Sequence, residues 1–163
     1  ALTGLDLRNF ETSTSLTNMS YMFQNCAALP TVDVTGFVTT NVTNMSYLFN
    51  GCAALNNVDV KGFNTKKVTA MQYMFNNCSS LEAIDLNGQN FKGDAATNMS
   101  YMFNGCSSLA TVAADKFTAD KVTNASYMFG TCSSLTELDL SNFAAKATLT
   151  NVQNMFSGCN RFV

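Results

Sequence analysis

The feature that most constrains this chain is an internal repeat of about 26 residues. Six cysteines mark it at intervals of 26, 26, 28, 26 and 27 residues; they are Cys26, Cys52, Cys78, Cys106, Cys132 and Cys159. Six copies fill the 163 residues, so we predict one solenoid domain spanning residues 1–163. A unit this short cannot bury its own apolar face, and neighbouring copies must stack to form a core.

Aromatic residues follow the same period and explain a composition rich in Phe and poor in charge. Twelve of the 13 phenylalanines form two columns. One contains Phe10, Phe37, Phe63, Phe91, Phe117 and Phe143, and the other contains Phe23, Phe49, Phe75, Phe103, Phe129 and Phe156. We expect the second column to lie in the core, together with the recurring Met and Leu residues.

Two hydrophobic periods alternate within each copy. Residues 42–55 place apolar side chains at intervals of three and four, which predicts a short helix with Thr43 as its N-cap. Residues 58–60, Val-Asp-Val, alternate with a period of two, which predicts a strand with an outward Asp, and Gly62 suits the turn that follows. The predicted fold is an α/β solenoid of about six strand–turn–short helix coils, with a parallel β-sheet on one face.

The composition excludes several kinds of chemistry. The chain has no histidine, which removes Ser-His-Asp and Cys-His catalysis and histidine-bound metals. The net charge of −2 argues against a nucleic-acid partner, and no stretch is long enough to insert into a membrane. The cysteines have two interpretations, disulfides or buried thiols, and we favour buried thiols because they share the inward face. We predict no enzymatic activity, no cofactor and no metal.

The strand segment L-x-x-V-D-V-x-x-F has the spacing of a leucine-rich-repeat strand, with Phe in place of the usual Asn. The full unit, N-M-S-Y-M-F-N-G-C-S-S-L-x-x-L-D-L-S-N-F, resembles the repeat of BspA-like bacterial surface proteins over practically the whole chain. The fifth copy departs from it, since residues 112–114 lack the Asp and Ala125 replaces Met. The resemblance implies a leucine-rich-repeat segment at the bacterial cell surface or outside the cell, adhesion to host proteins in some members, and no catalytic residues.

The first candidate surface is a column of carboxylates on the strand face, formed by Asp6, Asp33, Asp59, Asp85 and Asp139. In a parallel stack they would lie about 4.8 Å apart, so hydrogen bonds, lysines or a cation must offset their repulsion. Calcium is not favoured, because the flanking aliphatic residues supply no further oxygen ligands. A hydrogen-bonded, solvated column and a partner-binding surface both remain open.

A second column on the same face differs in every copy: Arg8, Thr35, Lys61, Asn87, Asp115 and Ser141. Changing side chains beside a regular scaffold are typical of recognition, although drift on a tolerant surface would look the same. The third candidate is an outer stripe of Tyr21, Tyr47, Tyr73, Tyr101 and Tyr127. These rings either project outward for recognition or pack on the helix of the next copy.

Two functions follow as alternatives. The chain is expected to be a binding or adhesion module for a host or neighbouring-cell macromolecule, such as a protein or an extracellular-matrix component, or a structural spacer without a specific ligand. It starts inside a repeat and lacks polar caps. We therefore expect a fragment of a longer surface protein, whose exposed ends would favour end-to-end self-association.

Overall fold

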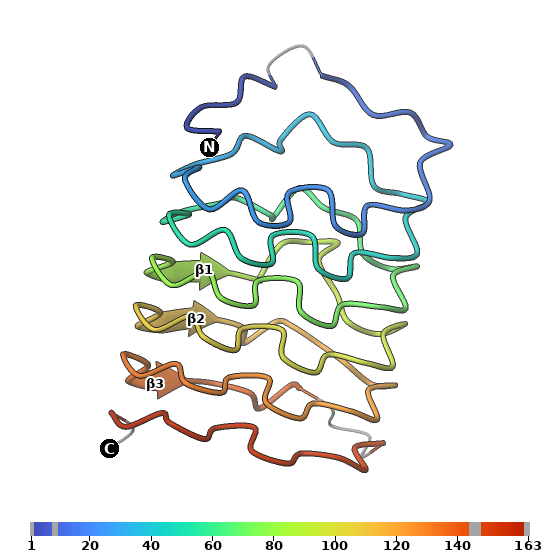
Figure 1. The fold of residues 1–163 in the computed structure, drawn as a ribbon. Coiled ribbons are helices and arrows are strands. Elements are labelled where there is room, and N and C mark those ends of the chain that lie inside the picture. The colour runs from blue at the N-terminus through green and yellow to red at the C-terminus, as the bar shows by residue number, and fades with distance from the viewer. Residues whose placement is uncertain (1, 8–9, 144–147, 162–163) are drawn as a thin grey trace.

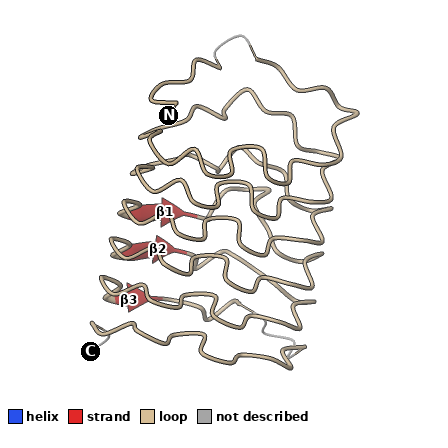
Figure 2. Cartoon of the chain, in the orientation of Figure 1, coloured by secondary structure: helices blue, strands red, loops and turns tan. Residues whose placement is uncertain are grey.

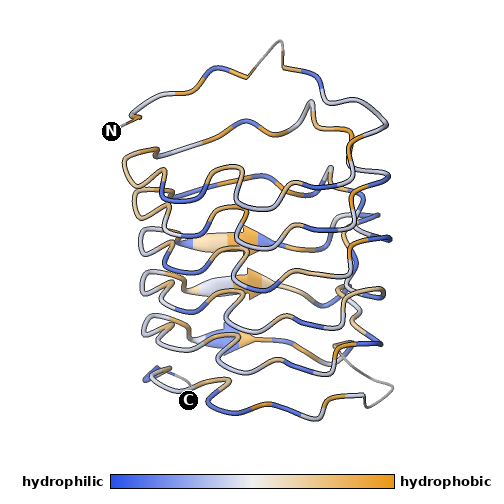
Figure 3. Cartoon of the chain, turned by 45° about the vertical axis from the view of Figure 1, so that its right-hand side comes forward, coloured by the Kyte–Doolittle hydropathy of each residue, from blue (hydrophilic) through white to orange (hydrophobic). Residues whose placement is uncertain are grey.

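The computed structural model describes residues 2–7, 10–143 and 148–161. Each repeat forms one turn of the chain, which we call a coil, and successive coils stack so that the N- and C-termini lie at opposite ends (Figure 1). Apolar and polar residues alternate along each coil and recur at the same place from one coil to the next (Figure 3). The described residues therefore form a solenoid, as the repeat predicts.

Three short strands form a parallel sheet along one side of the stack (Figure 2). They are β1 (Ala83–Asp85), β2 (Thr111–Ala113) and β3 (Glu137–Leu138), in the order β1-β2-β3. Ile84 pairs with Val112 and Val112 with Leu138, so equivalent residues of adjacent coils lie side by side. Ile84 and Val112 are buried while their neighbours are exposed. The predicted alternation and the outward Asp of β1 are thus confirmed.

The predicted short helix is not observed, because none of the described residues is helical. In the segment expected to be a helix, every second backbone N–H donates to a carbonyl of the next coil. These donors are Met45, Tyr47, Phe49 and Gly51, at 2.8–3.1 Å from their acceptors Ala70, Gln72, Met74 and Asn76. Tyr47 and Gly51 also have φ values of 59° and 75°, in the left-handed region. Tight turns replace the helix.

The spacing of the coils explains this correction. Rings of the second phenylalanine column in adjacent coils lie 5.3–5.8 Å apart between centroids, and the stacked tyrosine rings lie closer still. Packed helices need an axial separation of about 8–10 Å. One helix per coil would hold the coils too far apart, whereas an extended, turn-rich backbone can bond directly to its neighbours.

The predicted threonine caps are likewise corrected. The Thr43 N–H and hydroxyl both donate to the Thr17 carbonyl of the preceding coil, at 2.8 and 3.2 Å. The side chain that closes the local turn is the next residue, Asn44, whose Oδ1 accepts the Ser46 N–H at 2.9 Å. The threonine column therefore joins coils, and the asparagine column shapes each turn.

The core is continuous from the first coil to the last. The second phenylalanine column stacks with ring planes within 13° of parallel, and Phe49, Phe75 and Phe103 are fully buried. Met45, Met71 and Met99 fill the space beside it. Within the described ranges no helix could span a lipid bilayer.

Candidate functional site

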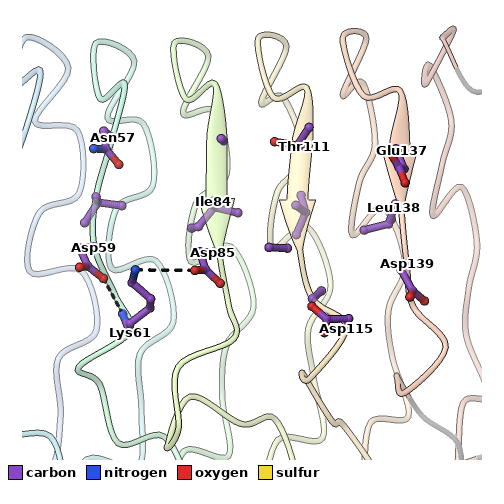
Figure 4. A pocket seen from close by; sticks show the side chains of 15 residues that line it. Asn57, Asp59, Lys61, Ile84, Asp85, Thr111, Asp115, Glu137, Leu138 and Asp139 are labelled. Carbon is purple, nitrogen blue, oxygen red and sulfur yellow. Dashed lines mark hydrogen bonds and ion pairs between the residues drawn. The ribbon is translucent and has the colours of Figure 1, made fainter.

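The sheet side of the molecule contains an open groove of about 500 Å³, which we call the strand-face groove (Figure 4). Consecutive coils from the third to the sixth line it, including all three strands. Its charged lining residues are Asp59, Lys61, Asp85, Asp115, Glu137 and Asp139. Five carboxylates face one ammonium group, so the groove is acidic.

Local turn geometry holds the predicted carboxylate column in place. In four coils the Asp Oδ1 accepts the backbone N–H two residues later, at 2.8–3.0 Å; the acceptors are Asp33, Asp59, Asp85 and Asp139. These residues and Asp6 are exposed. An Asx turn explains why an acidic residue follows an inward aliphatic one at the end of the strand.

Hydrogen bonds also offset the repulsion expected along the column. The Thr35 hydroxyl donates to Asp33 at 2.7 Å, and this bond, with that from the Thr35 N–H, lowers the pKa of the Asp33 carboxyl. The N–H and hydroxyl of Ser141 lower the pKa of Asp139 in the same way. These carboxyls remain ionised at neutral pH and keep the face negative.

Two members of the column of changing residues, Lys61 and Asn87, form links between coils. Lys61 Nζ lies 3.7 Å from Asp85 Oδ2, with both side chains about half exposed, so the ion pair contributes little stability. The Asn87 amide donates to the Asp115 carboxylate. The structure therefore brings Lys61, Asp85, Asn87 and Asp115 together, whereas Arg8 lies outside the described residues.

The acidic residues are not arranged as a metal site. Among the residues that the structure describes, no three His, Cys, Asp or Glu side chains are grouped so that they could hold an ion. Glu137, at the start of β3, also lines the groove. Sequence reasoning missed it, although its place two residues before Asp139 put it on the same outward face of the strand.

The five tyrosines form a single stack, which we call the tyrosine ladder. Successive ring centroids lie 4.6–4.8 Å apart with planes within 11° of parallel. The stack continues to Asn154, whose amide donates to the Tyr127 hydroxyl. Desolvation is the main reason that the pKa of Tyr73 is raised. Of the two arrangements expected for the tyrosines, outward projection or packing on the next copy, the ring faces therefore show packing on neighbouring coils. The ladder nevertheless stays partly exposed.

Every residue of the ladder has a positive φ, between 54° and 63°. The fourth residue after each tyrosine has one too, and that position holds Asn, Gly, Asn, Gly and Thr in coils one to five. Asn and Gly tolerate left-handed backbone best, so this alternation was the sequence signal against a helix.

The cysteines are all unpaired thiols, and five of them bond across coils. The Sγ of each donates to a phenylalanine carbonyl of the preceding coil at 3.0–3.2 Å; the donors are Cys52, Cys78, Cys106, Cys132 and Cys159. Burial raises the pKa of Cys52 to about 11 and that of Cys132 to about 12. Such thiols are poor nucleophiles at neutral pH.

Comparison with solved structures supports this architecture. A leucine-rich repeat protein from Eubacterium ventriosum superposes with a TM-score of 0.52 at 20% identity, covering 83% of this chain and 32% of that one. The T. pallidum leucine-rich repeat protein gives a TM-score of 0.51 at 19% identity, covering 91% and 72%. The chain thus spans about a third of the Eubacterium protein. The likeness shows a leucine-rich-repeat type of solenoid.

Sequence comparison identifies the family. No curated protein matches the chain significantly. The model of one family, described as "Mycoplasma protein of unknown function, DUF285", matches residues 2–111 and again residues 82–163, so the two matches together span nearly the whole length. The repeated unit thus accounts for both the matches and the stacked coils, and the chain belongs to the DUF285 family.

Proposed function

We propose that the chain is a non-enzymatic binding module of a BspA-like bacterial surface protein, located at the cell surface or outside the cell. In this proposal it recognises a protein or an extracellular-matrix ligand of a host or neighbouring cell through the strand-face groove. The observation that carries the proposal is the groove itself, a concave surface built on a repeated frame but lined differently by each coil.

The lining changes in both size and charge along the stack. The third coil supplies Asn57, Asp59 and Lys61, whereas the fourth supplies Ala83 and Asp85. The fifth coil presents Thr111, Ala113 and Asp115, and the sixth presents Glu137 and Asp139. A partner laid across the strands would meet a different set of side chains at each step, which is how a regular scaffold acquires specificity.

The charge of the groove indicates the chemistry of the partner. Its five carboxylates are exposed, and one lysine opposes them. An exposed acidic surface steers a basic partner during encounter and adds to specificity more than to affinity. We therefore expect a partner that presents Lys or Arg side chains along an extended segment or a shallow ridge.

A structural spacer is the alternative function, and one observation favours it. Four carboxylates of the column accept turn N–H groups in their own coil. Folding alone therefore explains why those positions hold Asp. If no partner engages the groove, the coils would serve only to separate or display other parts of a longer surface protein.

The test is capture of extracellular-matrix and serum proteins by the 163-residue chain, compared with a variant carrying Asp59→Asn, Asp85→Asn and Asp139→Asn. Asparagine retains an Oδ1 acceptor for the turn and removes the charge. We expect capture of a basic protein to fall at least tenfold in the variant, by an amount that shrinks with added salt. The control is Glu11→Gln with Asp94→Asn, two exposed acids outside the groove. Equal capture by all three proteins would favour the spacer.

The tyrosine ladder is the second candidate surface in the same experiment. Tyr73→Phe removes the hydroxyl of a partly exposed residue and keeps the stacked ring. A loss of capture with this variant, but not with the triple Asp→Asn variant, would place recognition on the tyrosine side of the solenoid.

A further inference from the structure

The carboxylates of the strand face form an unbroken series at every second coil. Coils two, four and six each have an Asp at the same position of the repeat, and all three are exposed: Asp33, Asp85 and Asp139. The series on the odd coils is broken, because in the fifth coil Ala113 takes this position and pairs with Asp85 in the parallel sheet. Asp85 and Asp139 therefore lie in one row on either side of β2 (Figure 4).

Small side chains accompany the carboxylates along this face. Ala83, Thr111 and Ala113 are exposed residues of β1 and β2, and all three line the strand-face groove. A second open hollow, lined in part by Thr31 and Asp33, continues the same face over the first two coils. The strand face thus offers a shallow path along the stack, across the direction of the strands.

The advance from coil to coil sets the distance between the three carboxylates. Adjacent parallel strands lie about 4.8 Å apart, so two coils advance about 9.6 Å. The ring separations of 4.6–4.8 Å in the tyrosine ladder agree with this advance. From Asp33 to Asp139 the row spans four coils, which is about 19 Å.

A peptide lying along this path must repeat at the same interval to meet every carboxylate of the row. In the polyproline II conformation three residues make one turn and advance about 9.3 Å, so every third side chain faces the same way. An α-helix advances about 5.4 Å per turn and a β-strand about 6.8 Å per two residues, and both lose register with the coils within a few repeats. Polyproline II is the conformation whose repeat matches two coils.

We propose that the strand face binds a polyproline II segment with Lys or Arg at every third residue, which lies along the stack so that its basic side chains meet Asp33, Asp85 and Asp139. The proposal rests on the binding function proposed above and specifies its partner. The exposed carboxylates supply the charge complementarity. The intervening residues of the segment contact small side chains such as Ala83 and Ala113. A segment that is already ordered loses little conformational entropy on binding.

Lys61 opposes such a partner, because its Nζ lies 3.7 Å from Asp85 Oδ2. Both side chains are about half exposed, so the ion pair is weak and a basic side chain of the partner can compete for Asp85. Lys61→Gln should therefore strengthen binding of a basic polyproline II peptide at least twofold. Lys66→Gln, which changes an exposed lysine outside the groove, is the control and should have a smaller effect.

Two peptides of identical composition test the spacing. One consists of three Pro-Pro-Lys units followed by Pro-Pro-Pro, and the other of three Pro-Pro-Pro-Lys units. In polyproline II the lysines of the first share one face, whereas each lysine of the second is turned by a third of a revolution from the one before. Titration of the isotope-labelled chain at low salt, followed by its amide chemical shifts, should give an at least threefold lower Kd for the first peptide. The largest shifts should fall on the strand face.

Two variants with the same loss of charge show which carboxylates carry the preference. The test variant contains Asp33→Asn, Asp85→Asn and Asp139→Asn. The control variant contains Asp59→Asn, Asp115→Asn and Glu137→Gln, which also line the groove. We expect the test variant to bind both peptides equally and weakly. The control variant should bind both more weakly than the unmodified chain but keep the preference for the first.

Equal affinity of the unmodified chain for the two peptides, or binding of neither, would overturn the inference. A preference that survives in the test variant would overturn it as well. In each case the proposed function is judged separately, by capture of a basic protein with the Asp59→Asn, Asp85→Asn, Asp139→Asn variant. If that capture still falls, the groove binds a basic partner of another conformation; if it does not, both proposals fail.

Discussion

At the scale of single residues, the stacked phenylalanines carry much of the stability. Phe75 lies between Phe49 and Phe103, 5.4 and 5.3 Å from their ring centroids, and is completely buried. Phe156 occupies the last place of the same column and is 42% exposed. The two residues therefore have the same side chain and the same stacking direction but very different burial.

The first prediction follows from this pair. Phe75→Ala should lower the free energy of unfolding by about 3–5 kcal/mol, because it removes a buried ring and leaves a cavity between two others. Phe156→Ala should lower the free energy of unfolding by less than half of that amount. Denaturant titration measures both. Equal costs would mean that ring burial does not govern stability along this column.

The buried thiols predict how stability depends on pH. Burial raises the pKa of Cys52 to about 11 and that of Cys132 to about 12, above the ordinary thiol value of about 8.5. A group whose pKa is higher in the folded state stabilises the fold below its unfolded pKa, and this stabilisation is lost as pH rises towards the folded value. The relevant window therefore runs upward from about pH 8.5.

We accordingly expect the free energy of unfolding to fall more steeply above pH 8.5 in the unmodified chain than in a Cys52→Ala, Cys132→Ala variant. The gap between the two should narrow by up to about 1.4 kcal/mol per thiol for each pH unit between pH 8.5 and the folded-state pKa. All other ionisable groups are shared by both proteins, so the comparison isolates these two thiols. Parallel pH profiles would contradict this account.

At the scale of elements, the sequence predicted the strand correctly and predicted a helix where the structure has turns. Val58-Asp59-Val60 and its equivalents alternate with a period that only an extended segment produces, and β1 and β2 show that alternation. The apolar spacing of residues 42–55 fits a helix equally well as it fits successive turns, because both return to the same face every three or four residues. The spacing between coils decides between the two, and no single copy contains it. Within the sequence, the signal against a helix is the recurring Asn or Gly at the left-handed position four residues after each tyrosine.

The sequence also predicted the candidate surfaces in part: it identified which residues share a face but not how they are bonded. The sequence placed Asp59, Lys61 and Asp85 on one outward face, and the structure brings them together in the groove. It could not show that each Asp closes a turn in its own coil, or that Asn87 bonds to Asp115 across coils. Those contacts depend on backbone angles and on register, which residue types alone do not specify.

The left-handed turn positions yield a prediction at this scale. Thr131 is an exposed β-branched residue with φ of 53°, a conformation that L residues adopt at a cost and glycine does not. Gly51, Gly105 and Gly158 already occupy the equivalent position in three other coils. Thr131→Gly should therefore raise the free energy of unfolding by about 1 kcal/mol.

The matched control is Thr111→Gly, which makes the same change in an exposed residue of β2. Glycine in a strand is unfavourable, so this variant should lower the free energy of unfolding by about 0.5–1 kcal/mol. Thermal unfolding of the two variants beside the unmodified chain measures the contrast. If both variants lose stability, the left-handed backbone at residue 131 does not limit the fold.

At the scale of the whole molecule, coils contact only their neighbours, so stability should add up coil by coil. Removing residues 44–69 excises one complete repeat and joins Thr43 to Ala70, the residue that follows the equivalent threonine in the next copy. We expect this protein to fold, with a lower thermal midpoint and a denaturant m-value reduced by roughly one sixth. Circular dichroism during denaturation tests both quantities.

Removal of residues 44–56 alone is the control, because it deletes half a coil and shifts every later column out of alignment. That protein should lose cooperative unfolding, since Phe23 would no longer lie above an equivalent ring. A half-coil deletion as stable as the full-coil deletion would show that the columns are not required to coincide.

The regular advance of the tyrosine ladder has a consequence for how such proteins evolve. Each coil extends the stack by the same small step, seen in ring separations of 4.6–4.8 Å, and leaves the cross-section unchanged. Duplication or loss of one repeat in the gene would therefore alter the reach of the protein by a fixed increment while preserving the contacts of the remaining coils. The length of the solenoid would therefore change between related proteins by whole coils.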